Sequence, residues 1–172
     1  SAGVAASGWS TSAVFFDAEA DGDLDLFVTR YLAWEPGRER QCFSLTGRVD
    51  FCSPKNYDAP TSDLLFLNDG RGTFTDTSVA AGLTAARGNG LGVVADDVNG
   101  DGRMDLLEKD GWWEQPKSQA GDPLWTFHEF AFNPNSHGGA QMYAYDVNGD
   151  KLNDIITSFA AHGFGLVWYE QV

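Results

Sequence analysis

Basic residues, cysteine and long apolar runs are all scarce in this sequence. Its 172 residues include 11 Lys and Arg against 25 Asp and Glu, which gives a formal net charge of −14. Because nucleic acids bind basic surfaces, we expect no nucleic-acid partner. No apolar run reaches the roughly 18 residues of a membrane helix, so we also expect no membrane span. The length predicts one domain, residues 1–172, with a hydrophobic core.

Sequence motifs of common enzymes are missing as well. The chain contains no Gly-x-Ser-x-Gly nucleophile elbow, no His-Glu-x-x-His zinc motif and no phosphate-binding glycine loop. The sequence therefore favours a protein without catalysis, and no catalytic residue is predicted.

What the sequence does contain is an acidic loop that occurs three times. Oxygen-bearing side chains recur at positions 1, 3, 5 and 9, a mostly apolar run precedes each copy, and an apolar pair follows it. A strand–loop–strand unit repeated in this way predicts a repeat architecture. The side chains at these positions are Asp17, Glu19, Asp21 and Asp25 in loop one, Asp97, Asn99, Asp101 and Asp105 in loop two, and Asp146, Asn148, Asp150 and Asp154 in loop three.

This spacing is typical of a calcium site, and we expect two to three Ca²⁺ ions. Ca²⁺ takes six to eight oxygens from carboxylates, amides, backbone carbonyls and water. Position 6 needs a left-handed backbone, which Gly22 and Gly102 adopt easily and Lys151 does not. The alternative is an Asp- and Gly-rich surface turn that binds no metal. Position 7 offers its backbone carbonyl, and the residues there are Asp23, Arg103 and Leu152.

An EF-hand is a second alternative for loop two. Glu108 lies at position 12 of that loop, where an EF-hand has its bidentate glutamate. The same position is Val28 in loop one and Thr157 in loop three, and the flanks are rich in Gly and β-branched residues. The sequence thus favours strands rather than helices around each loop.

The loops and one further segment resemble a known family. Asp-x-Asp/Asn-x-Asp-Gly-x-x-Asp-Leu between two strands is similar to the calcium loop of FG-GAP (VCBS-like) repeats, the blades of integrin-α-type β-propellers. Residues 65–76, Leu-Phe-Leu-Asn-Asp-Gly-Arg-Gly-Thr-Phe-Thr-Asp, resemble the outer hairpin of bacterial and cartilage-acidic-protein-like members. The resemblance implies an all-β fold with about three β-propeller-type blades of antiparallel strands, each with a calcium loop between its first two strands. That family spans adhesion, ligand-binding and enzyme-attached modules.

The chain divides into three blades with one insertion. Residues 35–60 interrupt blade one and contain both cysteines. Two cysteines ten positions apart in a loop predict a disulfide, Cys42–Cys52; two free thiols are the alternative. The predicted strands are 13–16, 24–31, 63–68 and 73–77 in blade one, segments between 90 and 132 in blade two, and segments between 138 and 171 in blade three, which lacks a fourth strand.

Calcium loops and a disulfide point to the same compartment. Calcium loops of ordinary affinity suit the millimolar calcium found outside cells, and disulfides persist under the oxidising conditions there. The sequence therefore predicts an extracellular or periplasmic, secreted protein. A cytosolic protein with free thiols is the alternative.

Three residues are candidates for ligand binding. His137 and His162 stand beside glycine in loops of blade three that can converge, and together they could bind a ligand or a transition metal. Trp112 could stack on a sugar ring. The alternatives are ordinary loop histidines and aromatic packing between blades, because the neighbours Trp112 and Trp113 point to opposite faces of a strand.

The combined expectation is a calcium-stabilised module that binds a glycan or a protein, or that assembles with other blades. The alternative is a propeller fragment of a polysaccharide-active lyase or hydrolase, with a carboxylate-lined cleft outside the loops. Closed propellers need four to eight blades. Three blades therefore predict either a homodimer with one six-bladed ring, in which residues 1–10 cover the partner's last strand, or completion by other blades.

Overall fold

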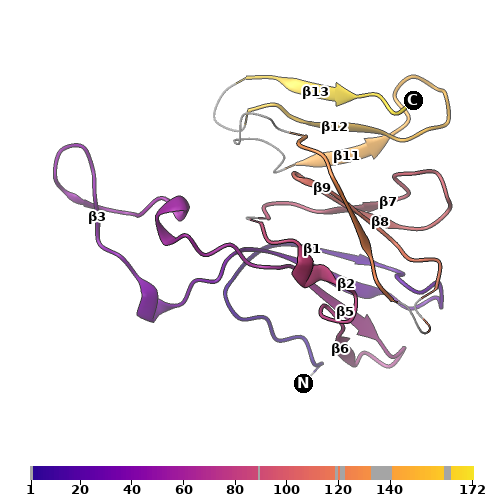
Figure 1. The fold of residues 1–172 in the computed structure, drawn as a ribbon, viewed down its shortest axis with the longest axis horizontal. Helices are drawn as coiled ribbons and strands as arrows, with labels where there is room; N and C mark the ends of the chain where they lie inside the picture. Colours follow the sequence, from indigo (N-terminus) through magenta and orange to yellow (C-terminus); the bar gives the residue numbers. More distant parts are fainter. Residues whose placement is uncertain (1, 89, 119, 121–122, 133–140, 161–163) are drawn as a thin grey trace.

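Three antiparallel sheets follow one another along the chain and stack as layers (Figure 1). The structure is a computed structural model that describes residues 2–88, 90–118, 120, 123–132, 141–160 and 164–172. These residues confirm the all-β expectation: they form an arc of three blades and no closed propeller. None of the described helices is long and apolar enough to cross a membrane. The helices are three short 3-10 turns, η1 (Pro36–Arg38), η2 (Pro54–Tyr57) and η3 (Leu83–Ala85).

Blade one is a four-stranded sheet with the order β1-β2-β5-β6. Its first strand begins at Trp9, before the predicted start at Ala13, because Trp9 pairs with Leu32 of the next strand. The outer hairpin closes at Asp69, whose carboxylate accepts the backbone N–H groups of Arg71 and Thr73. The strands are β1 (Trp9–Phe16), β2 (Asp25–Leu32), β5 (Leu64–Asn68) and β6 (Phe74–Asp76).

Blade two has the order β10-β9-β8-β7, so every strand pairs with its neighbour along the chain. A tight turn joins β8 to β9 and places Glu108 opposite Gly111. Gly111 is required there, because a Cβ atom at this position would lie 2.2 Å from the carbonyl oxygen of His128. The strands are β7 (Val94–Asp96), β8 (Asp105–Glu108), β9 (Gly111–Glu114) and β10 (Thr126–Glu129).

Blade three has three strands in the order β11-β12-β13. In the part of the chain that the structure describes it has no fourth strand, as the sequence predicts. One face packs on blade two, and the other exposes Tyr143, Tyr145, Leu166 and Trp168, with exposed fractions between 46% and 83%. The strands are β11 (Met142–Tyr145), β12 (Asp154–Ser158) and β13 (Leu166–Tyr169).

The core consists of two apolar layers between the blades. Successive residues of a strand point to opposite faces, so Leu106 of β8 packs toward blade one, whereas Leu107 packs toward blade three. The same alternation places Trp113 in the first layer and Trp112 against the second. Blade two therefore holds the arc together through both of its faces.

The N-terminal segment, residues 2–8, lies along its own blade one. The carbonyl oxygen of Ala2 accepts the backbone N–H of Phe74 at 2.8 Å, and Ser7 accepts a hydrogen bond from the Arg30 guanidinium at 3.4 Å. A third, apolar cluster with Val28, Leu64 and Phe66 is buried on the side of blade one away from blade two. Blade one is thus bonded to its own N-terminal segment, although Phe15 stays 58% exposed, whereas blade three keeps an open face.

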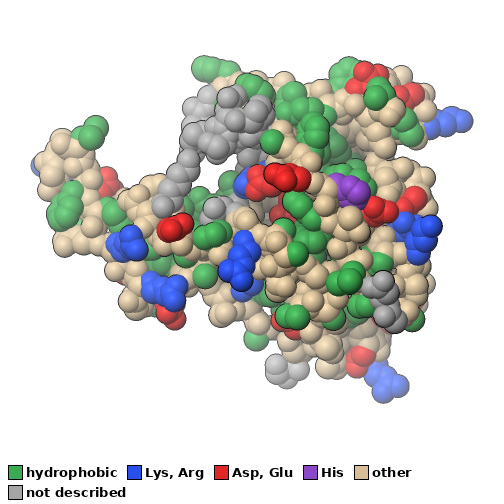
Figure 2. All heavy atoms as spheres, viewed as in Figure 1, with side chains coloured by type: hydrophobic (Ala, Val, Ile, Leu, Met, Phe, Trp, Pro, Cys, Tyr) green, Lys and Arg blue, Asp and Glu red, His purple; other side chains and the backbone are tan. Residues whose placement is uncertain are grey.

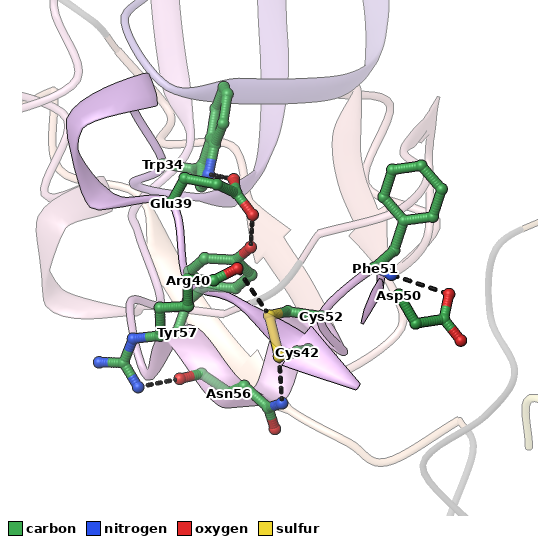
Figure 3. Close-up of a disulfide and its surroundings, with 9 residues drawn as sticks. All are labelled: Trp34, Glu39, Arg40, Cys42, Asp50, Phe51, Cys52, Asn56 and Tyr57. Atoms are coloured by element: carbon green, nitrogen blue, oxygen red, sulfur yellow. Dashed lines mark hydrogen bonds between the residues drawn. A yellow bond between two sulfur atoms is a disulfide. The ribbon is translucent and has the colours of Figure 1, made fainter. Parts of the chain in front are cut away.

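The insertion between β2 and β5 projects from the blades at the end opposite the acidic loops (Figure 1). It carries a small hairpin of β3 (Cys42–Phe43) and β4 (Val49–Asp50). The predicted disulfide is present: Cys42 and Cys52 are joined, with their Cα atoms 5.1 Å apart (Figure 3). Beyond it, Leu45 and Phe51 are almost fully exposed, and hydrophobic side chains are visible on this projection at the left of Figure 2.

Candidate functional site

The three acidic loops lie at one end of the three stacked blades, at the right of Figure 1. Each loop connects the first two strands of its blade: 17–25 joins β1 to β2, 97–105 joins β7 to β8, and 146–154 joins β11 to β12. The strands on both sides confirm the preference for strands over an EF-hand. Because the loops occupy the same place in each blade, their geometry can be compared position by position.

The carboxylate at position 1 organises each turn. Asp17 accepts the backbone N–H groups of Asp21 and Gly22 at 3.1 and 3.0 Å. Asp97 accepts those of Asp101 and Gly102, and Asp146 accepts those of Gly149, Asp150 and Lys151. The first side chain of every loop is therefore held toward the inside of the turn.

In loops two and three the side chain at position 3 bonds inward together with that at position 1. In loop two the side-chain oxygens of Asp97 and Asn99 both lie 3.0 Å from the backbone nitrogen of Asp101. In loop three Asp146 and Asn148 converge on Asp150 in the same way, at 3.1 and 3.0 Å. In both loops the side chains at positions 1 and 3 thus converge on the amide of position 5.

Two positions of each loop adopt a left-handed backbone, not only the predicted position 6. At position 6 the φ angles are 94° for Gly22, 85° for Gly102 and 75° for Lys151. Position 4 is left-handed as well, and loop one has Ala20 there, with φ of 56°. Loops one and three therefore each keep one residue in a conformation that costs a non-glycine residue roughly 1–2 kcal/mol. Position 4 in loops two and three is Gly100 and Gly149.

The aspartate at position 9 has a role that the sequence did not predict. Asp25, Asp105 and Asp154 are 0–1% exposed. Each accepts two backbone N–H groups through its two oxygens, at 2.7–3.1 Å. One donor lies at position 2 of the same loop, and the other lies at or just beyond the end of the third strand of the blade. The donors are Ala18 and Asn68 for Asp25, Val98 and Gln115 for Asp105, and Val147 and Gln171 for Asp154.

Burial raises the pKa of two loop carboxylates, Glu19 and Asp105. Burial, together with the neighbouring Asp25, Asp21 and Asp17, raises the pKa of Glu19. Burial raises the pKa of Asp105 to about 6, although the N–H groups of Gln115 and Val98 act in the opposite direction. In the described residues no three His, Cys, Asp or Glu side chains form a ready metal cluster. Counting these four side-chain types alone leaves out the amide and carbonyl oxygens that Ca²⁺ also uses.

Side chains also link each loop to its neighbour. Gln115 accepts the backbone N–H of Met104 at 2.8 Å and donates to the carbonyl oxygen of Ala18, so it bridges loops two and one. Asn153 donates to the carbonyl oxygen of Asp97 at 3.1 Å and so bridges loops three and two. The Arg103 guanidinium bonds Asp101 and lies 3.7 Å from Glu114. It already places a positive charge beside one of the predicted ligands.

The other predicted ligand residues lie outside this region or outside the described chain. Trp112 is half-buried and stacks on His128, with ring centroids 4.1 Å apart, while Nε2 of His128 bonds Glu114 at 2.7 Å. This stack lies within blade two, and Trp112 also packs against the apolar layer between blades two and three, which is the packing between blades that the sequence offered as the alternative. The proposal that Trp112 binds a sugar remains a prediction. His137 and His162 fall outside the described residues.

Sequence reasoning missed a buried pair of acids between blades one and two. Glu108 is 9% exposed, accepts the indole N–H of Trp113 at 3.1 Å and hydrogen-bonds the carboxylate of Asp63. Burial and the neighbouring charge of Asp63 raise the pKa of Glu108 well above its usual range, and burial raises the pKa of Asp63 as well. Asp63 also accepts the backbone N–H of Arg30 at 2.6 Å. Glu108 and Asp63 are far apart in sequence. The only signal in the sequence was that neither residue occupies a ligand position of the acidic loops.

Comparisons with known proteins agree with the repeat geometry. Residues 45–108 match the family described as FG-GAP-like repeat, a segment that contains the outer hairpin of blade one and all of loop two. Cartilage acidic protein 1 of Mus musculus is 38% identical over 89 residues. That alignment covers 52% of this chain and 13% of the length of the relative. The resemblance expected from the sequence is thus confirmed.

Proposed function

We propose that this chain, an FG-GAP-type repeat protein, is a calcium-stabilised extracellular module that binds or assembles with other proteins and catalyses no reaction. The observation that carries the proposal is the shared geometry of the three acidic loops. Their position-1 carboxylates accept equivalent backbone N–H groups, and their left-handed residues fall at the same two positions. A surface turn without a ligand has no reason to repeat this pattern in three blades.

The residues of each loop fit a hard cation. Position 1 and position 3 oxygens converge on a single amide nitrogen in loops two and three, so the loop interior is lined by oxygen. The ligands would be the side chains at positions 1, 3, 5 and 9 with the carbonyl oxygen at position 7, as the sequence predicts. Bound Ca²⁺ would neutralise the clustered carboxylates. Arg103 supplies part of that neutralisation at Asp101.

The position-9 aspartate makes the loop part of the blade. Since Asp25, Asp105 and Asp154 each hold the loop to the third strand, a cation that binds the loop also supports the sheet. Gln115 and Asn153 extend this support to the next blade. Calcium would therefore stabilise the whole arc rather than three separate turns.

Secretion is supported by two independent features. The chain contains a disulfide, which persists in oxidising compartments. FG-GAP-type repeats are typical of extracellular adhesion and binding modules. Loops that need calcium would be filled at the millimolar concentrations found there.

Binding is favoured over catalysis by where the buried pair of acids outside the loops lies. A glycosidase or lyase needs carboxyl groups that reach substrate in a cleft. The Asp63–Glu108 pair is packed between two blades, and Glu108 is engaged by Trp113. Its carboxyl groups therefore serve the blade interface.

Assembly is favoured by the open face of blade three. Tyr143 and Trp168 lie in one row across the sheet, on either side of Ile156, and both are about half exposed. Large exposed apolar faces promote association. We propose that a further blade or a second copy of the chain covers this face. Light scattering tests it: Trp168→Lys should yield a monomer, and association that survives this change would refute the assignment of the face.

Titration calorimetry with calcium tests the proposed function. The wild-type chain should bind two to three Ca²⁺ ions, and Mg²⁺ should bind more weakly because it demands a near-ideal octahedron and loses its water reluctantly. No saturable calcium binding by the folded chain would overturn the proposal.

A further inference from the structure

A groove lies between β1 and the insertion, far from the acidic loops. It has a volume of about 660 Å³, within the range typical of ligand pockets. Aromatic and apolar side chains from both elements form its walls, and one carboxylate lies among them. Among the residues that line it are Trp9, Trp34, Glu39, Phe51 and Tyr57.

Glu39 is held in place by the aromatic side chains around it (Figure 3). One oxygen accepts the indole N–H of Trp34 at 2.9 Å, and the other accepts the hydroxyl of Tyr57 at 2.8 Å. The Tyr57 hydrogen bond raises the pKa of the tyrosine, as expected when its proton is shared with an anion. Neither partner carries a charge, so the negative charge of Glu39 is oriented without being neutralised.

The rings meet at steep angles rather than in a flat stack. Trp9 and Trp34 are 6.4 Å apart with an interplanar angle of 66°, and Trp9 and Tyr31 are 6.1 Å apart at 84°. A flat sugar ring prefers one broad parallel surface. These edge-to-face contacts cover part of each ring, but Trp9 is still 50% exposed and lines the groove with Glu39, where its indole can attract a cation.

Nearby cations are already engaged. The Arg38 guanidinium lies 3.3 Å from Glu35, and Arg40 donates to the carbonyl oxygen of Asn56 at 2.6 Å. The insertion itself, residues 35–60, has four acidic and four basic residues, so the local attraction for a cation rests on Glu39. Glu39 is the carboxylate that lines the groove, and its charge favours a positively charged occupant.

We propose that this groove, which we call the Glu39 groove, binds a lysine-type ammonium group on a protein partner. Trp9, Trp34 and Tyr57 would surround the ammonium group and its methylene stem, and Glu39 would balance its charge. The inference deepens the proposed binding function and rests on it. It names the site and the chemistry of the partner.

A protein partner fits the surroundings better than a lipid headgroup. Phe43, Leu45 and Val49 are exposed on the adjacent hairpin, where they can contact apolar residues that flank the lysine. Arg48 and Asp50 lie on the same hairpin, so its tip would carry both charges into a bilayer. The strongly acidic chain is also repelled by anionic membranes.

The test uses two small probes that differ in charge and little in shape. N-acetyl-lysine methylamide and its neutral norleucine counterpart are titrated into the calcium-loaded protein, and the indole N–H signals are followed by NMR. The lysine probe should shift the Trp34 and Trp9 signals in a saturable manner at millimolar concentrations, and its trimethylated form should shift them at least as strongly. The norleucine probe should leave them unchanged.

Glu39→Gln keeps the shape of the side chain and removes its charge, and it should weaken binding of the lysine probe at least tenfold. Glu35→Gln is the control, because Glu35 bonds Arg38 and does not line the groove. Equal binding by Glu39→Gln, or equal shifts with norleucine or a neutral sugar, would overturn the proposal. Binding of phosphatidylcholine vesicles that Glu39→Gln abolishes would assign the groove to a lipid and also overturn it. Calcium binding, measured on the same samples, reports separately on the proposed function.

Discussion

The carboxylate of Asp105 accepts the backbone N–H of Gln115 at 2.9 Å and thereby ties the acidic loop of blade two to the end of its third strand. Asp25 and Asp154 make the corresponding bond in the other blades. The last acid of the loop is thus a structural link as well as a predicted ligand. Calcium binding and blade stability are expected to be coupled for this reason.

Backbone strain in loop three should be removable. Lys151 has φ of 75° at a position where loops one and two have glycine. Lys151→Gly should stabilise the protein by about 1 kcal/mol in thermal unfolding, because glycine adopts this conformation without a steric penalty. Lys117→Gly, which replaces a lysine outside the repeats, serves as the control and should give no such gain. A loss of stability in Lys151→Gly would show that the lysine side chain compensates for the strain.

The assignment of side-chain and backbone ligands can be separated by two substitutions. Asp101→Ala should reduce the calcium stoichiometry by one, because Asp101 is a proposed side-chain ligand and its carboxylate also supports the turn at Arg103. Asp23→Ala should keep the stoichiometry, because only the carbonyl oxygen of Asp23 is assigned to the metal. Titration calorimetry compares them. Equal effects would mean that the register within the loops is wrong.

The buried acid pair predicts a pH dependence that one substitution removes. Glu108 has its pKa raised well above its ordinary value of 4.5, so the folded chain binds this proton more tightly than the unfolded chain. The contribution of Glu108 to the free energy of unfolding is fully present below pH 4.5. It is lost as the pH rises through the pKa of Glu108 in the folded chain. Glu108→Gln should therefore flatten the decline of the unfolding free energy between pH 4.5 and 7. The exposed Glu129→Gln should leave the slope unchanged, and an unchanged slope in Glu108→Gln as well would contradict the assignment.

Reduction of the disulfide should loosen the insertion and spare the sheets. Cys42 and Cys52 belong to one insertion and link no blade to another. In the chain-entropy model, a disulfide that closes such a short loop contributes roughly 2–3 kcal/mol to stability. Amide hydrogen exchange of the reduced protein should rise in residues 35–60 and stay low in β2 and β8. Faster exchange in those two strands would show that the insertion supports the blades.

Much of the fold follows from local sequence patterns. The acidic spacing, the apolar runs beside it and the cysteine pair predict the blades, the loops and the disulfide, because each depends on residues close together in the chain. The left-handed position of Ala20 was missed because its sequence carries no glycine there to mark it. The position-9 links were missed because their donors are backbone N–H groups, which have no sequence signature.

Contacts between distant segments account for the rest. The Asp63–Glu108 pair and the Glu39 groove each join segments that only the folded chain brings together. The N-terminal segment was expected to cover a partner's last strand, and in this chain it lies along its own blade one instead. Its small residues give no indication of which strand they contact.

Thermal unfolding with calcium and with a chelator tests the central claim most directly. If Ca²⁺ binds the folded loops, stability should rise by about 2.7 kcal/mol for each site when calcium is a hundredfold above its dissociation constant. The calcium-loaded chain should therefore melt well above the chelated chain, and Mg²⁺ at the same concentration should not restore the difference. Equal melting temperatures in calcium and in chelator would contradict the account of the acidic loops as calcium sites.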